Sequence, residues 1–440
     1  MSYDVIVVGA RCAGAVLGTL LARSGVKTLM LDADTLPSDM AMSTHYIHPP
    51  GMDVLDELGV GERVRKVTPP TRRGRWDIDS ITLSLQFPVG RTAYCVRRST
   101  VDPMLQEAAT TAGAELRDRH RVVDLVTDGE RVAGVVVETP GGRETLRAKL
   151  VVGADGRSST VARLTGVEEY LTFPMTRSAY WFYFREPPLW RKDPRFADWD
   201  VLLEWKGDGL RYVFQCDGDL LLTLVMPPSA EARGWGKDYK ARTLEYLARS
   251  ETIRPLVEAS ETVGKGMGLV KADFYYRRPV GPGFALVGDA GSFKDFVTGH
   301  GMTDAFLGAK RLHQAILADK PAAFERYWLE RDAETMPLYF DAIQTGEVGF
   351  NNAFSRLFFE HLSRHPELAA RLPAVFDRKL SPLEAFSPGE LAKVLLGALI
   401  RGRFDVVRPF LASGKRVGGW SAEVARRKKA LKAAAETPGA

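Results

Sequence analysis

Four glycine-containing motifs, each with an acidic residue in it or close to it, are the parts of this sequence best suited to chemistry. Residues 9–14 read Gly-Ala-Arg-Cys-Ala-Gly, and Asp32 follows eighteen positions after the last of these glycines. The other three motifs occupy residues 153–159, 281–290 and 298–305. Glycine lets backbone N–H groups approach a phosphate closely, and a carboxylate accepts hydrogen bonds from ribose hydroxyls. These residue types therefore indicate a nucleotide site.

The first motif lies in an expected strand–helix–strand unit. Tyr3–Val8 is short, apolar and β-branched, as in a strand buried on both faces, and Ala13–Arg23 has helical apolar periodicity. Lys27–Leu31 is the second strand, and it ends at Asp32. The order predicts a dinucleotide-binding unit whose helix N-terminus faces a pyrophosphate. The alternative is a nucleotide-free unit in which the glycines of residues 9–14 only turn the chain.

The later motifs also have an expected structural context. Arg121–Val126, Arg131–Glu138 and Arg143–Val152 are separated by turn residues, which predicts a three-stranded antiparallel meander. The last of these strands leads directly into residues 153–159. Residues 281–290 predict a turn, a buried strand and then an acid, and a helix is expected to begin within residues 298–305.

Together these motifs resemble the group A flavoprotein monooxygenases, which are para-hydroxybenzoate hydroxylase-like, and their wider superfamily with geranylgeranyl reductases and flavin halogenases. The resemblance covers about residues 1–335. It implies an α/β (α+β) fold, in which a Rossmann-like FAD-binding domain of glutathione-reductase type carries an inserted antiparallel-sheet substrate domain and a helical C-terminal region. The implied limits are 1–75, 95–170 and 272–335 for the FAD domain, 76–94 and 171–271 for the substrate domain, and 336–440 for the helical region with its basic tail.

The resemblance also implies which residues hold FAD. It places residues 9–14 at the pyrophosphate, Asp32 at the adenosine ribose, Asp289 at the ribityl chain and residues 299–302 beside the isoalloxazine ring. Arg98 begins the Arg-x-x-hydrophobic-Asp signature of the family, the amide of Val122 meets adenine, and Asp155 belongs to a motif that supports FAD and NAD(P)H. The cofactor residues expected on this basis are Gly9, Arg11, Cys12, Ala13, Gly14, Asp32, Arg98, Val122, Asp155, Asp289, Gly299, Gly301 and Met302.

Some positions depart from the family pattern. Arg11 stands in place of the middle glycine, where its charge could pair with phosphate, and Arg163 comes one residue late after Asp155. Gly291 replaces a usual histidine, and His300 replaces a common glutamine. These departures bear on how NAD(P)H binds and on the detailed contacts with the flavin.

The activity implied by the resemblance is an FAD-dependent monooxygenase. NAD(P)H would reduce FAD, and O2 would form a flavin C4a-hydroperoxide that hydroxylates or epoxidises an aromatic or polycyclic apolar small molecule, as in natural-product metabolism. One alternative is an FAD-dependent reductase of isoprenoid double bonds, and a second is a non-catalytic flavin-binding protein. Halogenation is disfavoured because the strings at residues 75–78 and 180–183 do not match the Trp-x-Trp-x-Ile-Pro motif of the halogenases.

Aromatic and ionisable residues suggest where the substrate binds. Eleven aromatic residues fall between Tyr180 and Phe214, in which alternating strands are expected, and they either line an apolar pocket or fill a sheet–helix interface. The candidate catalytic acid–base groups are His45, His300 and Asp295. For His45 the alternative is a local structural role, and for Asp295 it is a surface pair with Lys294.

Composition limits the setting. The three cysteines are far apart and form no Cys-x-x-Cys, which argues against a disulfide framework or a zinc site. No secretory signal and no apolar run of membrane-spanning length is recognised, so a cytoplasmic protein is expected. Of the net charge of +5, the segment 391–440 carries eleven basic and three acidic residues. Residues 424–435 are expected to form a basic helix at a membrane surface or protein partner, or a solvated frayed end. No nucleic-acid motif is present.

Overall fold

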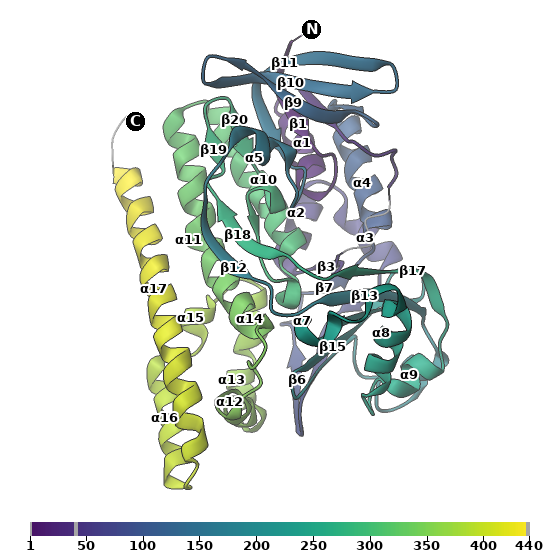
Figure 1. The fold of residues 1–440 in the computed structure, drawn as a ribbon, viewed down its shortest axis with the longest axis vertical. Coiled ribbons are helices and arrows are strands. Elements are labelled where there is room, and N and C mark those ends of the chain that lie inside the picture. The colour runs from purple at the N-terminus through teal and green to yellow at the C-terminus, as the bar shows by residue number, and fades with distance from the viewer. Residues whose placement is uncertain (1, 39–42, 437–440) are drawn as a thin grey trace.

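The computed structural model describes residues 2–38 and 43–436, and its upper half in Figure 1 is built on a mainly parallel sheet. The parallel strands follow the order β20 (Phe284–Leu286), β11 (Gly142–Gly153), β1 (Ser2–Val8), β2 (Thr28–Leu31) and β8 (Glu115–Arg117). The predicted first strand, helix and second strand are confirmed. β1 is nearly fully buried because neighbouring strands and helices cover both of its faces.

The predicted meander is also confirmed. β9 (Arg121–Asp128) and β10 (Arg131–Thr139) pair antiparallel with each other, and β10 pairs with the first half of β11. The second half of β11 then enters the parallel sheet beside β1. One long strand therefore connects the meander to the motif at residues 153–159.

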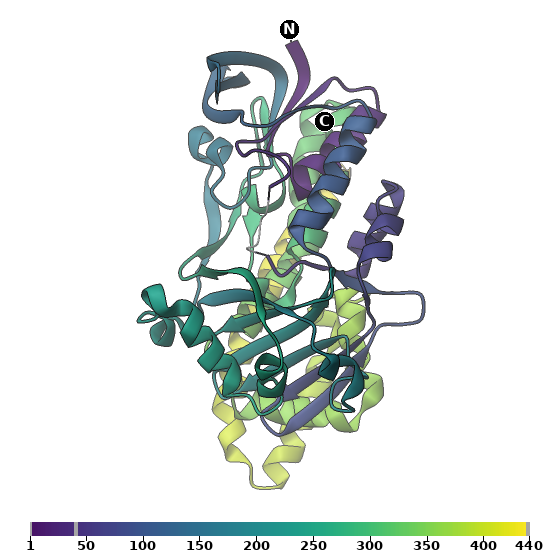
Figure 2. The same ribbon diagram turned by 90° about the vertical axis from the view of Figure 1, so that its right-hand side faces the viewer.

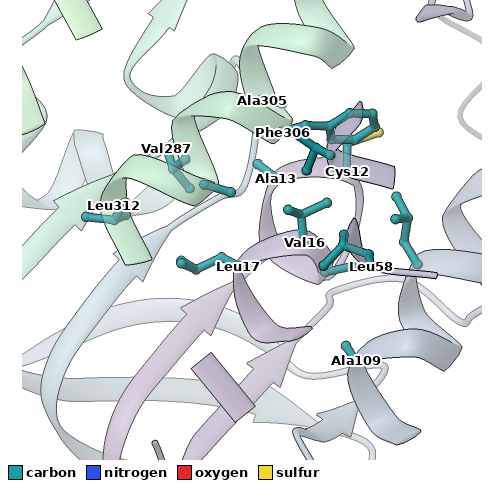
Figure 3. Close-up of a cluster of buried hydrophobic side chains, with 14 of the residues drawn as sticks. Cys12, Ala13, Val16, Leu17, Leu58, Ala109, Val287, Ala305, Phe306 and Leu312 are labelled. Atoms are coloured by element: carbon teal, nitrogen blue, oxygen red, sulfur yellow. The ribbon is translucent and has the colours of Figure 1, made fainter. Parts of the chain in front are cut away.

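A layer of helices covers one face of the parallel sheet. α1 (Cys12–Arg23) contacts both α10 (Gly301–Ala318) and α4 (Arg98–Thr111). Figure 3 shows Val16 and Leu17 of α1 in one buried cluster with Phe306 and Leu312 of α10. This packing places the N-termini of three helices close to the motifs singled out in the sequence.

The lower half of Figure 1 contains a separate seven-stranded sheet. Its order is β17 (Thr262–Leu269), β13 (Ala179–Arg185), β16 (Leu220–Met226), β15 (Gly209–Cys216), β14 (Val201–Lys206), β5 (Arg73–Ile78) and β6 (Ile81–Gln86). The expected inserted sheet is present and is antiparallel except between β14 and β5, which are parallel. The exception arises because β5 and β6 come from a segment far earlier in the chain.

Short elements link the two sheets. The small sheets are formed by β3 (Tyr46–Ile47), β7 (Ala93–Cys95) and β4 (Pro70–Thr71), and by β12 (Glu169–Pro174), β18 (Asp273–Arg277) and β21 (Ser292–Phe293). The accompanying helices are α2 (Pro49–Glu57), α3 (Gly61–Val67), α5 (Thr160–Thr165), α6 (Pro188–Lys192), α7 (Ser229–Ala232), α8 (Tyr239–Ala248) and α9 (Arg254–Glu258).

The C-terminal part is helical, as expected. Its helices are α11 (Pro321–Gly346), α12 (Ala353–Arg364), α13 (Pro366–Ala369), α14 (Arg371–Phe376), α15 (Pro382–Ala385), α16 (Pro388–Ile400) and α17 (Val407–Glu436). Prolines at positions 337, 366, 373 and 388 predict breaks between helical runs in this part of the sequence. Helices begin at Pro366 and Pro388, but the break predicted at Pro337 is wrong because α11 continues through it. Met336 and Leu338 are buried on either side, so tertiary packing offsets the hydrogen bond that proline removes.

α17 lies along α11 and does not extend away from the fold (Figure 1). Trp420 stacks on Phe340 with ring centroids 5.0 Å apart, and Val424 is buried. Arg427 forms an ion pair of 3.2 Å with buried Asp332. Among residues 2–38 and 43–436, no helix combines the length and the apolar character that a bilayer crossing requires.

Candidate active site

The turn between β1 and α1 forms a tight cradle. Gly9 has a φ of +99°, and a Cβ at this position would lie 2.4 Å from the carbonyl oxygen of Ala154. A Cβ at Gly14 would lie 1.8 Å from the carbonyl oxygen of Gly9. Within the described part of the chain, no side chain caps the N-terminus of α1, and its first turn has no acidic residue. The backbone N–H groups of this turn are therefore suited to bind an anion.

Asp32 closes one side of the cradle. It is buried and accepts hydrogen bonds from the N–H groups of Ala10 and Asp34, both at 3.1 Å. The Arg11 guanidinium pairs with the carboxylate of Asp34 and lies 3.6 Å from that of Asp32. Two carboxylates thus already neutralise Arg11, and its pairing with a phosphate stays a prediction.

Arg98, Cys12 and Asp289 meet beside this cradle. Nε of Arg98 donates to Asp102 at 2.8 Å, and the thiol of Cys12 donates to the same carboxylate at 3.4 Å. Burial raises the pKa of Asp289 to about 6, although the charge of Arg98 opposes this shift. Gly288 has a φ of +64°, and a Cβ there would lie 3.0 Å from the Cβ of Ala13. The structure therefore brings three separated motifs to the N-terminus of α1.

Three residues expected at the cofactor use their side chains in the fold. The Asp155 carboxylate accepts from the Ser159 hydroxyl at 2.5 Å and the Thr160 N–H at 2.7 Å, at the start of α5. The side chains of Val122 and Met302 are buried in apolar clusters. Their cofactor roles stay predictions.

The loop before α10 has buried charges. The Asp295 carboxylate accepts from the Val297 N–H at 3.0 Å, and burial raises the pKa of Asp295 to about 7. The proposed surface pair of Asp295 with Lys294 is wrong because both residues are buried and Lys294 pairs with Asp304. Arg378 pairs with the same Asp304 carboxylate. This ion triad connects the loop, α10 and the C-terminal helices.

His300 and His48 form a buried pair at the N-terminus of α10. Their ring centroids are 4.3 Å apart, and Gly299 between the loop and the helix has a φ of +67°. Nε2 of His48 donates to the Thr298 carbonyl at 2.9 Å, whereas neither ring nitrogen of His300 has a hydrogen-bond partner among the described residues. Burial lowers the pKa of His48 to about 4 and that of His300 well below its usual value. Both imidazoles are therefore neutral at pH 7.

His45 lies apart from this pair. It is fully buried with a φ of +56°, and a hydrogen bond of 2.5 Å joins its Nε2 to the Tyr183 hydroxyl. Burial, with a contribution from Arg98, lowers the pKa of His45 to about 3. A non-glycine residue at this φ is strained, and such strain persists only where its surroundings impose it. The structure thus places two of the three candidate acid–base groups, His300 and Asp295, at the loop and the start of its helix, whereas His45 directly precedes β3 and is bonded to Tyr183 of β13.

An apolar cavity lies between the seven-stranded sheet, the loop and the C-terminal helices. The cavity is lined by Thr44, Tyr46, His48, Thr71, Arg72, Gly74, Trp76, Leu85, Gln86, Phe87, Val201, Leu203, Trp205, Tyr212, Phe214, Leu224, Phe296, Val297, Thr298, Gly299, Thr345, Pro373 and Phe376. The hydroxyl of Tyr212 donates to the Val297 carbonyl at 2.7 Å and so ties the sheet to the loop. Residues 296–299 form part of the cavity wall, and the chain continues directly from them into residues 299–302, which are expected beside a flavin ring.

The aromatic-rich segment divides between the two faces of the sheet. Trp205, Tyr212 and Phe214 line the cavity. Tyr180 and Phe182 pack with α8 and α9 on the other face. The division follows from the alternation of side chains along a strand, so both interpretations of the segment hold for different residues.

Several cavity residues have no signal in the sequence. Phe376 of α14 stacks on His48 at 5.3 Å and lies 5.9 Å from Trp76, by ring centroids. Trp76 lies in residues 75–78, for which the sequence shows only that they do not match a halogenase motif. Phe376 lies in the C-terminal segment that the family resemblance does not cover. A lone aromatic residue in an amphipathic segment is more often core than site, and only the fold distinguishes the two.

The site geometry fits FAD at the positions that an adenine dinucleotide requires. The glycine cradle, the uncapped start of α1 and the acid at the end of β2 lie together, and Arg98 and Asp289 lie beside Cys12 at the start of α1. Replacing Gly9 or Gly14 by any other residue would fill the cradle.

Known proteins support this assignment. A family model described as the FAD binding domain matches residues 2–317. A 12-dehydrotetracycline 5-monooxygenase/anhydrotetracycline 6-monooxygenase of Streptomyces rimosus is 31% identical over 170 residues, which are 38% of this chain and 33% of that protein. A digeranylgeranylglycerophospholipid reductase of Methanocella arvoryzae is 25% identical over 72% of this chain and 78% of that protein.

A solved structure shares the fold over almost the whole chain. A flavin-dependent brominase superposes with a TM-score of 0.75 at 19% identity and covers 92% of this chain and 100% of its own. At this identity the likeness concerns the fold alone. With the family match over residues 2–317 and the cradle that fits the cofactor, the chain belongs to the FAD binding domain family of flavin-dependent oxidoreductases.

Proposed function

We propose that the protein is an FAD-dependent monooxygenase that uses NAD(P)H and O2 to hydroxylate an aromatic or polycyclic small molecule. The observation that carries the proposal is the shared wall: Phe296–Gly299 lines the apolar cavity and leads into the helix beside which the isoalloxazine ring is expected. When bound, FAD supplies the redox chemistry, and the protein orients the substrate and excludes water. The similarity to a tetracycline monooxygenase supports this reading.

The cavity offers few polar groups, and they suggest how a substrate is oriented. Thr298 Oγ1 and Trp205 Nε1 belong to cavity-lining residues, and neither atom has a hydrogen-bond partner in the described part of the chain. A buried polar group without a partner is costly, so a ligand that satisfies it gains affinity. We infer that the substrate has a hydroxyl or carbonyl oxygen on an aromatic framework.

The neutral histidines limit the proton chemistry. At pH 7 neither His48 nor His300 carries a proton to give as an imidazolium, but His300 can accept one from a substrate hydroxyl. Asp295 is the only candidate of the loop whose pKa lies near 7. If His45→Ala, His300→Ala and Asp295→Asn all keep wild-type turnover with full FAD, then no side chain acts as acid or base.

The test uses the purified yellow holoprotein. NADPH and NADH oxidation and O2 uptake are measured against aromatic polyketides, phenols and polyprenyl compounds, with ¹⁸O2 and mass analysis of the product. Incorporation of one labelled oxygen atom supports the monooxygenase. Oxidation of NAD(P)H that no added compound stimulates argues against it.

A second candidate is a reductase of isoprenoid double bonds. It is favoured by the similarity to the digeranylgeranylglycerophospholipid reductase, which extends over most of both chains. Anaerobic turnover, with a product that gains two hydrogen atoms and no oxygen, would favour this candidate over the monooxygenase.

A further inference from the structure

Exposed apolar residues gather at one end of the molecule, far from the FAD-binding sheet. Leu396 and Ile400 of α16 are 58% and 77% exposed, Phe404 between the helices is 70% exposed, and Leu411 of α17 is 62% exposed. In both views, the turn that joins α16 to α17 is the lowest point of the molecule (Figures 1 and 2). We call these four residues the hairpin tip. Single exposed apolar residues are ordinary, but several on one projection mark an interaction site.

The tip is held in place by packing elsewhere on the same helices. Val394 and Ala398 of α16 are buried in a cluster with Leu357 of α12, so α16 has an internal apolar face besides Leu396 and Ile400. The Gln344 amide of α11 donates to the Ser413 hydroxyl of α17 at 2.8 Å. These contacts therefore fix the position of α16 and α17, and the exposed apolar face does not fold back onto the core.

Basic residues flank the tip along α16, the turn and α17. Residues 393–416 contain six Lys or Arg and a single acid, Asp405, which already pairs with Arg403 at 2.8 Å. The cations without an ion pair in the described part of the chain are Lys393, Arg401, Arg408 and Lys415. An apolar projection flanked by cations without ion pairs is complementary to a surface that carries anionic groups over an apolar interior.

We propose that the hairpin tip binds the surface of an anionic lipid bilayer, with Ile400, Phe404 and Leu411 entering the headgroup region and Arg401 and Arg408 contacting lipid phosphates. Apolar insertion combined with electrostatic attraction is how amphipathic segments bind membranes without crossing them. A second copy of the chain fits the tip less well, because a two-fold interface would bring the cations of both copies together. The proposal does not depend on the reaction that the flavin site performs.

Flotation with vesicles tests the proposal on the full-length holoprotein. We expect it to bind vesicles of phosphatidylcholine with phosphatidylglycerol and to bind pure phosphatidylcholine much less. The variant Ile400→Ser/Phe404→Ser/Leu411→Ser and the variant Arg401→Glu/Arg408→Glu should each reduce the bound fraction at least roughly tenfold. The control Val89→Ser/Val270→Ser removes exposed apolar residues elsewhere and should bind like the wild type.

All the substituted side chains are exposed, so flavin absorbance and melting temperature should match the wild type and separate lost binding from lost folding. The proposal is overturned if the wild type does not float with anionic vesicles, or if either tip variant binds them as well as the wild type does. It is also overturned if the wild type forms a dimer in sedimentation velocity that the apolar tip variant dissociates, since a second copy would then occupy the tip.

Discussion

The ion triad of Lys294, Asp304 and Arg378 should contribute a large share of the stability of the cavity. Asp304 on α10 accepts from Lys294 in the loop and from Arg378 just after α14, and all three side chains are no more than 14% exposed. Burial alone would raise the pKa of Asp304, but the two cations hold it below its ordinary value. Through this carboxylate the C-terminal helices are attached to the segment expected beside the flavin.

The variant Asp304→Ala leaves two buried cations without their partner. Removing one member of a buried ion pair costs about 3–5 kcal/mol, and we expect about 3 kcal/mol because Arg378 also contacts Glu334 at 3.3 Å. The corresponding fall in melting temperature is about 3 °C for a chain of 440 residues that unfolds cooperatively. The higher helix propensity of alanine offsets the lost interaction of the Asp304 carboxylate with the N-terminus of α10. Because the pKa of Asp304 is lowered in the fold, its contribution is present above the unfolded pKa of about 4 and is lost as pH falls further.

The assay follows unfolding of the holoprotein by tryptophan and flavin fluorescence at pH 7. A matched control is Asp198→Ala, which breaks the Arg73–Asp198 pair whose side chains are 44% and 70% exposed, and which should cost less than about 1 kcal/mol. Replacing the triad by Lys294→Met/Asp304→Leu/Arg378→Met should recover most of the loss. If Asp304→Ala melts at the same temperature as Asp198→Ala, the triad does not stabilise the site and the reasoning is refuted.

Three further outcomes are expected. Gly14→Ala brings a Cβ to 1.8 Å from a backbone oxygen and should yield protein without flavin, whereas Gly414→Ala, with no atom within 4 Å, should keep its full flavin absorbance. Asp295→Asn removes a carboxyl group whose pKa burial raises to about 7. The stability that the protonated carboxyl group contributes is fully present below about pH 4 and is lost as pH rises through about 7, so the melting temperature of the variant should rise relative to that of the wild type over this range. A difference in melting temperature that does not change with pH would contradict the burial argument. Phe376→Ala should raise KM for an aromatic substrate about tenfold at unchanged flavin content, and an unchanged KM would remove Phe376 from the binding wall.

Much of the cofactor half follows from local sequence. The strand at Tyr3–Val8, the helix after it and the meander are recognisable because their periodicity and turn residues depend on neighbours a few positions away. The cradle follows equally well, since only glycine fits where a Cβ would lie within 2.4 Å of a backbone oxygen. The break expected at Pro337 fails because burial of Met336 and Leu338 outweighs a local preference.

The cavity could not be predicted in the same way. Trp76, Trp205 and Phe376 come from β5, β14 and α14, and no spacing in the sequence relates them. The aromatic-rich segment indicated a pocket, but strand alternation directs only some of its residues toward it. The pairing of Lys294 with Asp304, and not with its neighbour Asp295, depends on which side chains face each other after packing.

The sequence by itself determined the FAD-binding unit, because a dinucleotide is held mainly by backbone groups whose geometry glycine and helix N-termini set locally. It also determined that a second sheet and a helical region follow. Only the tertiary structure decided where the apolar cavity lies, which histidines are buried and neutral, and that α16 and α17 project exposed apolar residues at one end of the molecule. Burial, pKa and exposure are properties of contacts between distant segments, and such contacts exist only once the chain has packed.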